Sequence, residues 1–191
     1  KMLHRRKRLP APKRRESLWK TRRTTIRYLL YFLMGLLLGS IAAVLCGADS
    51  IPFRIMVNQL TAERGLWVMW RESLLFSAIL LLYLMISARC LWGMGMIPMV
   101  PLVFGAGQGT AMTFLLILLG WKGIAYLLPG FILPKTVQLA AVILLCNTAQ
   151  TGCERLSGGE NSRQTLLWLA GAVLLAFGGL LQTVFRLKFT I

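Results

Sequence analysis

The chain has 191 residues, of which 57% are hydrophobic and only 15% carry a charge. A soluble domain is usually about one-quarter charged, so this composition excludes an ordinary water-soluble protein. It predicts an all-α fold that crosses the membrane several times, in keeping with a mean hydropathy of +0.66.

The net charge of +16 is concentrated at the N-terminus, because residues 1–27 contain twelve of the 22 lysines and arginines. A basic segment directly before an apolar run is typical of a cytoplasmic terminus, and it also attracts anionic lipid head groups. We therefore expect this basic segment to bind lipid and not nucleic acid. We divide the chain into a basic cytoplasmic tail, residues 1–27, and a membrane domain, residues 28–191.

The first predicted span covers residues 28–48, an uncharged run long enough to cross a hydrocarbon core of about 30 Å. Gly35 and Gly39 form a GxxxG pattern, which allows two helices to approach closely. The run is longer than the core of a cleaved signal and further apolar segments follow it, so we expect it to be retained.

Residues 49–72 have mixed composition and include Trp67 and Trp70, whose rings suit the head-group zone. They predict a short helix on the outer surface that leads into the second span, although an ordinary loop is the alternative. The second span is predicted at residues 73–90.

The third span, predicted at residues 94–119, contains Pro98 and Pro101, each of which lacks a backbone N–H. The carbonyls that they leave without a donor must find partners inside the protein, so we expect a bent helix that packs against other helices. The candidate packing residues in this span are Gly105, Gln108 and Gly109.

The fourth and fifth spans are predicted at residues 124–149 and 165–185, with a polar loop between them. Five spans place the C-terminus on the outer side if the basic tail is inside.

The segment Gly120–Lys135 contains Pro129 and Pro134, which prevent a regular helix. It is therefore predicted to be a protein-buried elbow at the outer face, where Trp121 and Lys122 anchor at the head groups.

The cysteines offer no metal site, because they lack CxxC spacing and the single histidine, His4, lies in the tail. We expect neither a metal nor a cofactor. The four cysteines are predicted to be free and to pack as small apolar side chains. They are Cys46, Cys90, Cys146 and Cys153.

The segment after the third span resembles the stage II sporulation protein M family of Gram-positive endospore formers. That family has a Gly-Trp-Lys-Gly turn, an apolar step, and then Leu-Pro followed by polar residues that open the next helix. The similarity covers roughly residues 74–145, while the N-terminal third matches in layout only. Lys135 stands where a neutral amide is expected. The matching residues are Gly120, Trp121, Lys122, Gly123, Leu133, Pro134, Lys135 and Gln138.

The resemblance implies a non-enzymatic membrane scaffold of the bacterial cell membrane. Such a scaffold anchors two peptidoglycan hydrolases, sporulation proteins D and P, for septal wall remodelling and engulfment of the forespore. It implies location at the sporulation septum and the engulfing membrane. Whether the chain forms a homo-oligomer stays open.

Two other functions compete with this interpretation. Glycine- and proline-interrupted spans are typical of a small transporter or permease subunit, whereas the predicted spans lack the acidic residues that ion coupling often uses. An intramembrane enzyme would need a positioned histidine or a carboxylate pair, and no acid falls within a predicted span. We therefore expect no catalytic residues.

Overall fold

The computed structural model describes residues 13–47, 50–61, 66–90, 92–120, 132–154 and 162–188. Within these ranges every regular element is a helix. Five segments are long and apolar enough to cross a membrane, which confirms the all-α, five-span prediction. The helices are α1 (Lys13–Cys46), α2 (Ile51–Thr61), α3 (Leu66–Arg89), α4 (Gly93–Met96), α5 (Met99–Leu119), α7 (Leu133–Glu154) and α8 (Ser162–Lys188).

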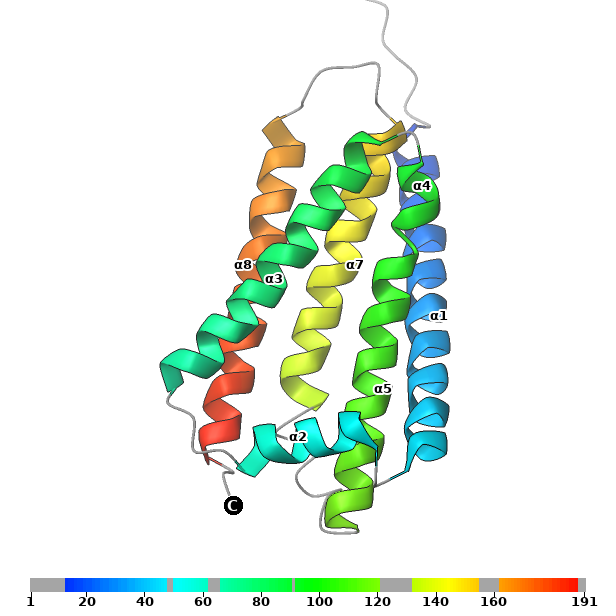
Figure 1. The fold of residues 1–191 in the computed structure, drawn as a ribbon. Helices are drawn as coiled ribbons and strands as arrows, with labels where there is room; N and C mark the ends of the chain where they lie inside the picture. The colour runs from blue at the N-terminus through cyan, green and yellow to red at the C-terminus, as the bar shows by residue number, and fades with distance from the viewer. Residues whose placement is uncertain are drawn as a thin grey trace, which may run out of the picture.

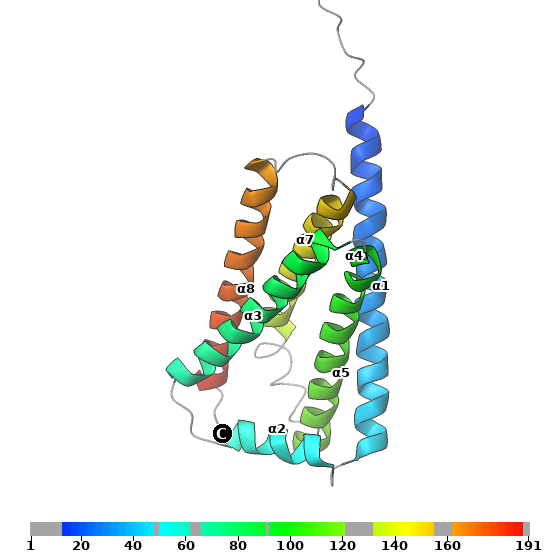
Figure 2. The ribbon, with the colours of Figure 1, turned by 45° about the horizontal axis from the view of Figure 1, so that its top comes forward.

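The five long helices alternate in direction along one bundle, and α2 lies across one end of it (Figures 1 and 2). We call this end the α2 end and the opposite end, where α1 begins, the tail end. The ring of Phe53 packs edge-on against Phe114 of α5, with centroids 5.3 Å apart, and this contact holds α2 against the bundle.

Helices α1 and α5 make the most extensive contact in the described part of the chain. Glycines on both helices allow it. A Cβ atom at Gly35 would overlap the carbonyl oxygen of Leu102, and one at Gly39 would overlap that of Ala106. Gly105 and Gly109 of α5 face the backbone of α1 in the same way. The four glycines therefore set the distance between the two backbones.

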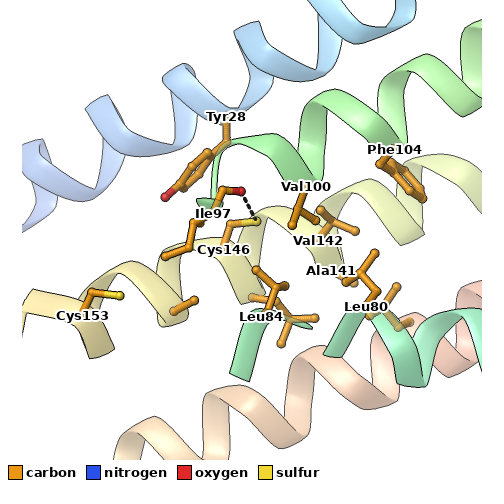
Figure 3. Packing of buried hydrophobic residues seen from close by; sticks show 13 residues of the cluster. Tyr28, Leu80, Leu84, Ile97, Val100, Phe104, Ala141, Val142, Cys146 and Cys153 are labelled. Carbon is orange, nitrogen blue, oxygen red and sulfur yellow. Dashed lines mark hydrogen bonds between the residues drawn. The ribbon is translucent and has the colours of Figure 1, made fainter. Parts of the chain in front are cut away.

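Helix α7 lies at the centre of the bundle, and its buried residues face α1, α3, α4 and α8 (Figure 3). Leu145 and Cys146 of α7 are fully buried, as are Leu84 of α3 and Ile97 between α4 and α5. Lipid tails are as apolar as these side chains, so close packing and not exclusion of water must stabilise this core.

The third span is broken at Ile97 and Pro98, between α4 and α5. Because Pro101 has no N–H, the carbonyl oxygen of Ile97 loses its helical donor. That oxygen instead lies 3.2 Å from the backbone nitrogen of Val100 and 4.0 Å from the buried thiol of Cys146 (Figure 3). The break is thus accommodated inside the protein, as the sequence predicted.

Helix α3 begins at Leu66, seven residues before the predicted start of the second span. The two tryptophans of residues 66–70 therefore belong to the spanning helix, and the short surface helix is α2 alone. Trp67 and Trp70 pack edge to face, with ring centroids 5.5 Å apart. Glu72, which was placed before the span, lies in the second turn of α3. No turn residue separates Glu72 from the apolar run, so the helix continues through it.

The native cysteines test the orientation of the bundle. Cys46 is exposed where α1 reaches the α2 end, and Cys90 is exposed where α3 reaches the tail end, whereas Cys146 and Cys153 are buried. With the basic tail in the cytoplasm, a membrane-impermeant maleimide should label only Cys46 in intact protoplasts and should also label Cys90 after permeabilisation. Loss of each signal in Cys46→Ser and Cys90→Ser would assign it. Labelling of Cys90 but not Cys46 in intact protoplasts would reverse the orientation.

Candidate functional site: a polar cavity between α3, α5, α7 and α8

A cavity of about 410 Å³ lies between four of the spanning helices, near the start of α3 and α7 and the end of α8. This volume falls within the usual range of sites for small molecules. Its polar side chains come from α3, α5, α7 and α8, and we call it the polar cavity. They are Glu72, Ser73, Gln108, Lys135, Gln138, Gln182 and Thr183.

The start of α7 explains how a charged side chain comes to lie between the helices. Helix α7 begins at Leu133, short of the level at which α5 ends (Figure 1). Its first turns, which carry Lys135 and Gln138, therefore lie between the other helices and not at the end of the bundle. Pro134 is fully buried there. A proline is tolerated at this position because the first turn of a helix has no internal acceptor for its N–H.

One hydrogen bond joins α7 to α8 at the polar cavity, and a second lies within α7. The Nζ atom of Lys135 donates to Oε1 of Gln138 at 3.0 Å, and Nε2 of Gln138 lies 3.4 Å from Oε1 of Gln182. The Lys135 ammonium also lies 5.9 Å from the centroid of the Phe104 ring, within the range of a cation–π interaction. A lysine in a spanning helix is costly unless it is paired in this way, so these contacts hold a positive charge inside the bundle.

A glycine allows the two helices to approach at this point. A Cβ atom at Gly178 of α8 would lie 2.6 Å from Cγ of Gln138. The Gln138 side chain therefore lies flat on the α8 backbone and is only 5% exposed. Its amide group is held in one place, where it can accept from Lys135 and donate to Gln182.

Gln108 of α5 is a buried polar residue with an unused acceptor. It is 7% exposed, and its Oε1 atom has no hydrogen-bond partner among the described residues. The Nε1 atom of Trp70 is likewise buried and has no hydrogen-bond partner among the described residues. A buried acceptor without a donor costs about 1–3 kcal/mol.

The predicted elbow residues fall into two groups in the structure. Gly120 ends α5 with a φ of 56°, in the region that favours glycine, and its N–H bonds the carbonyl of Leu116 at 2.9 Å. Pro134, Lys135 and Gln138 belong to α7, where the last two line the polar cavity. The remaining elbow residues lie outside the described part of the chain: Trp121, Lys122, Gly123 and Pro129.

The candidate packing residues also lie at two different places in the structure. Gly35, Gly39, Gly105 and Gly109 lie at the α1–α5 contact, where Oγ of Ser40 also approaches the Gly109 carbonyl at 3.4 Å. Gln108, in contrast, faces the polar cavity.

Glu72, Gln182 and Thr183 are members of the cavity that sequence reasoning missed. Glu72 was placed at the end of the surface segment before the second span, and the two α8 residues were counted only as part of a span. Glu72 lies within a segment that could cross the membrane. The absence of acidic residues from the predicted spans was an argument against transport. The position of Glu72 removes that argument.

The comparisons with known proteins add no relative to this description. No family model, no curated protein and no solved structure matches the chain. The interpretation of the site therefore depends on its residues and their geometry.

Proposed function

We propose that this protein is a non-enzymatic membrane scaffold that anchors and localises peptidoglycan hydrolases, with sporulation proteins D and P as its partners at the sporulation septum. The observation that carries the proposal is the resemblance of the segment that begins at Gly120. This glycine ends α5 at the α2 end of the bundle. With the basic tail in the cytoplasm, the C-terminal end of α5 lies on the outer side, where the cell wall lies.

Helix α2 supports this role because it adds a surface element at the same end. It lies across the bundle and does not cross the membrane (Figure 2). Its exposed residues combine apolar Ile51 and Ile55 with Arg54, a mixture that suits the membrane interface. A helix held there offers a partner a surface at the same end of the bundle as the C-terminal end of α5.

Affinity purification of the tagged full-length chain from sporulating cells tests the scaffold. We expect the two hydrolases to co-purify and to be identified by mass spectrometry. Replacing both Trp121 and Lys122 by alanine should leave the amount of inserted protein unchanged while it removes the hydrolases and blocks engulfment. Trp92→Ala with Arg89→Ala is the matched control, since it removes an exposed indole and an exposed cation from the tail end.

The outcomes separate the scaffold from a simple turn between helices. If the Trp121/Lys122 variant accumulates normally and still retrieves both enzymes, these two side chains have no part in recruitment. If the unaltered chain retrieves neither enzyme, the scaffold proposal fails as a whole.

A transporter or permease subunit is the second candidate, and the polar cavity is the observation that favours it. Lys135 and Glu72 line this cavity and lie in segments that could cross the membrane. Ionisable side chains within spanning segments commonly mark a solute path. Gly107→Phe should obstruct the cavity, because a Cβ there meets nothing within 4 Å. A transporter would lose its activity, whereas a scaffold would still recruit its partners.

A further inference from the structure

Two of the native cysteines lie close together at the tail end of the bundle, where α3 and α7 both end (Figure 1). Cys153 is the last residue but one of α7, and Cys90 directly follows Arg89, the last residue of α3. Cys90 is exposed, whereas Cys153 is only 8% exposed and belongs to the core of the bundle. One thiol therefore faces the surroundings, and the other is packed inside.

The contacts of Cys153 bring its sulfur to the end of α3. The Sγ atom of Cys153 lies 3.3 Å from the carbonyl oxygen of Ser87 and 3.5 Å from that of Ala88. The Ser87 oxygen also accepts a hydrogen bond from the backbone nitrogen of Cys90 at 3.3 Å. Because the Cys153 sulfur and the Cys90 nitrogen share this acceptor, they cannot lie further apart than the two distances together. A Cβ atom at Gly93 would lie 3.0 Å from the same sulfur.

The two thiols also interact electrostatically, which places the Cys90 sulfur near that of Cys153. A disulfide joins residues whose α-carbon atoms lie about 4.4–6.8 Å apart, so only neighbouring residues such as these can form one. Cys90 belongs to neither α3 nor α4. The turn that carries it can therefore shift toward Cys153 without unwinding either of the long helices.

The position of the pair suits a thiol that responds to an oxidant. With the basic tail in the cytoplasm, the pair lies on the reducing side of the membrane, where thiols are normally kept free. An accessible cysteine beside a second, resolving cysteine is the usual arrangement of a redox sensor. Cys46 lies at the opposite end of the bundle and Cys146 is fully buried, so neither of these has that arrangement.

We propose that Cys90 and Cys153 are a redox pair, in which hydrogen peroxide oxidises Cys90 and Cys153 then closes an intramolecular disulfide. In the first step the Cys90 thiolate sulfur attacks one peroxide oxygen, and the O–O bond breaks. The products are Cys90 sulfenic acid and a hydroxide, which takes up the proton released by the thiol and becomes water.

In the second step the Cys153 sulfur attacks the Cys90 sulfur, and the S–O bond breaks. The leaving hydroxide takes the Cys153 proton and becomes a second water. The two thiols thus lose two electrons and two protons, and the peroxide is reduced to two molecules of water. The bond ties together the ends of α3 and α7, two helices that line the polar cavity near their other ends. This inference goes beyond the scaffold proposal and does not depend on it.

Counting free thiols in the purified full-length protein tests the pair. The protein in detergent is treated with hydrogen peroxide, which catalase then removes, and it is unfolded and alkylated with iodoacetamide before its intact mass is measured. The untreated protein should take up four alkyl groups, one for each cysteine, and the oxidised protein should take up two. Proteolysis without reduction should then give a cross-linked peptide that contains Cys90 and Cys153. Four alkyl groups after oxidation, or a bond between other cysteines, would overturn the proposal.

Matched variants separate the roles of the two thiols. Cys153→Ala leaves Cys90 without its resolving thiol, so Cys90 should stop at the sulfenic acid and be labelled by dimedone. Cys90→Ser removes the accessible thiol, so the cross-linked peptide should disappear. Cys146→Ala is the control, because it also removes a buried thiol from α7. It should still form the Cys90–Cys153 bond and keep one alkylation site, at Cys46.

The remaining outcomes also decide the question. Equal dimedone labelling of Cys90 in the unaltered protein and in Cys153→Ala would show that Cys153 does not resolve the sulfenic acid. If Cys153→Ala does not fold, Cys90→Ser provides the same test from an exposed position, and persistence of the intramolecular disulfide there would contradict the pair. A disulfide between two copies of the chain, seen as a reductant-sensitive dimer in place of the cross-linked monomer, would also refute it.

Discussion

Gly39→Ala is expected to lower the midpoint of thermal unfolding in detergent by about 10 °C, a loss of about 3 kcal/mol. The added methyl group would overlap the carbonyl oxygen of Ala106. That oxygen belongs to the backbone of α5 and cannot rotate away as a side chain can. The two helices must therefore separate along their whole contact, which also loosens the packing around Gly35 and Gly105. Combining Gly35→Ala with Gly39→Ala should cost less than twice as much, because one separation relieves both overlaps.

Gly107→Ala provides the matched control for this effect. It also replaces a glycine by alanine, but at a position of α5 where a Cβ meets nothing within 4 Å. It should leave stability unchanged or raise it by up to about 1 kcal/mol, since alanine favours a helix more than glycine does. Equal losses from Gly39→Ala and Gly107→Ala would show that the close α1–α5 contact does not limit stability.

Leu145→Ala is expected to destabilise the bundle by about 3 kcal/mol, which is the usual cost of removing a fully buried leucine. Leu145 is 0% exposed at the centre of α7 and packs directly over Gly171 of α8. Its removal leaves a void that neither lipid nor water can enter, so its neighbours lose van der Waals contacts. Leu166→Ala on α8 is the control, because Leu166 is 69% exposed to the membrane and its truncation creates no cavity. It should cost less than about 1 kcal/mol.

A double substitution tests whether the cost arises at the α7–α8 contact. On its own, Gly171→Ala places a Cβ 2.6 Å from Cγ of Leu145, and it should destabilise the protein. In the Leu145→Ala background the same methyl group enters the vacated space and should recover about 1 kcal/mol. The measurement compares the unfolding midpoints of the unaltered protein, the two single variants and the double variant. Strictly additive losses would show that the cost of Leu145→Ala does not arise at the α7–α8 contact.

The number of spans could be predicted from residue order alone. Lipid offers no hydrogen bonds, so each crossing needs about 20 consecutive apolar residues in a helix, and such runs can be recognised locally. The break in the third span was equally predictable, because Pro98 and Pro101 remove donors wherever the helix lies. The start of α3 was harder to place. Residues up to Glu72 were expected to form a surface segment before the span, but α3 already begins at Leu66 because no turn residue separates Glu72 from the apolar run.

The polar cavity itself depended on the tertiary structure. Glu72, Gln108, Lys135 and Gln182 come from four different helices. Their meeting is decided by how far each helix is rotated and tilted. In a membrane almost every face of a spanning helix is apolar, so the sequence pattern does not reveal which face turns inward. Packing sets that rotation, above all the glycine contacts between α1 and α5 and the position at which α7 begins.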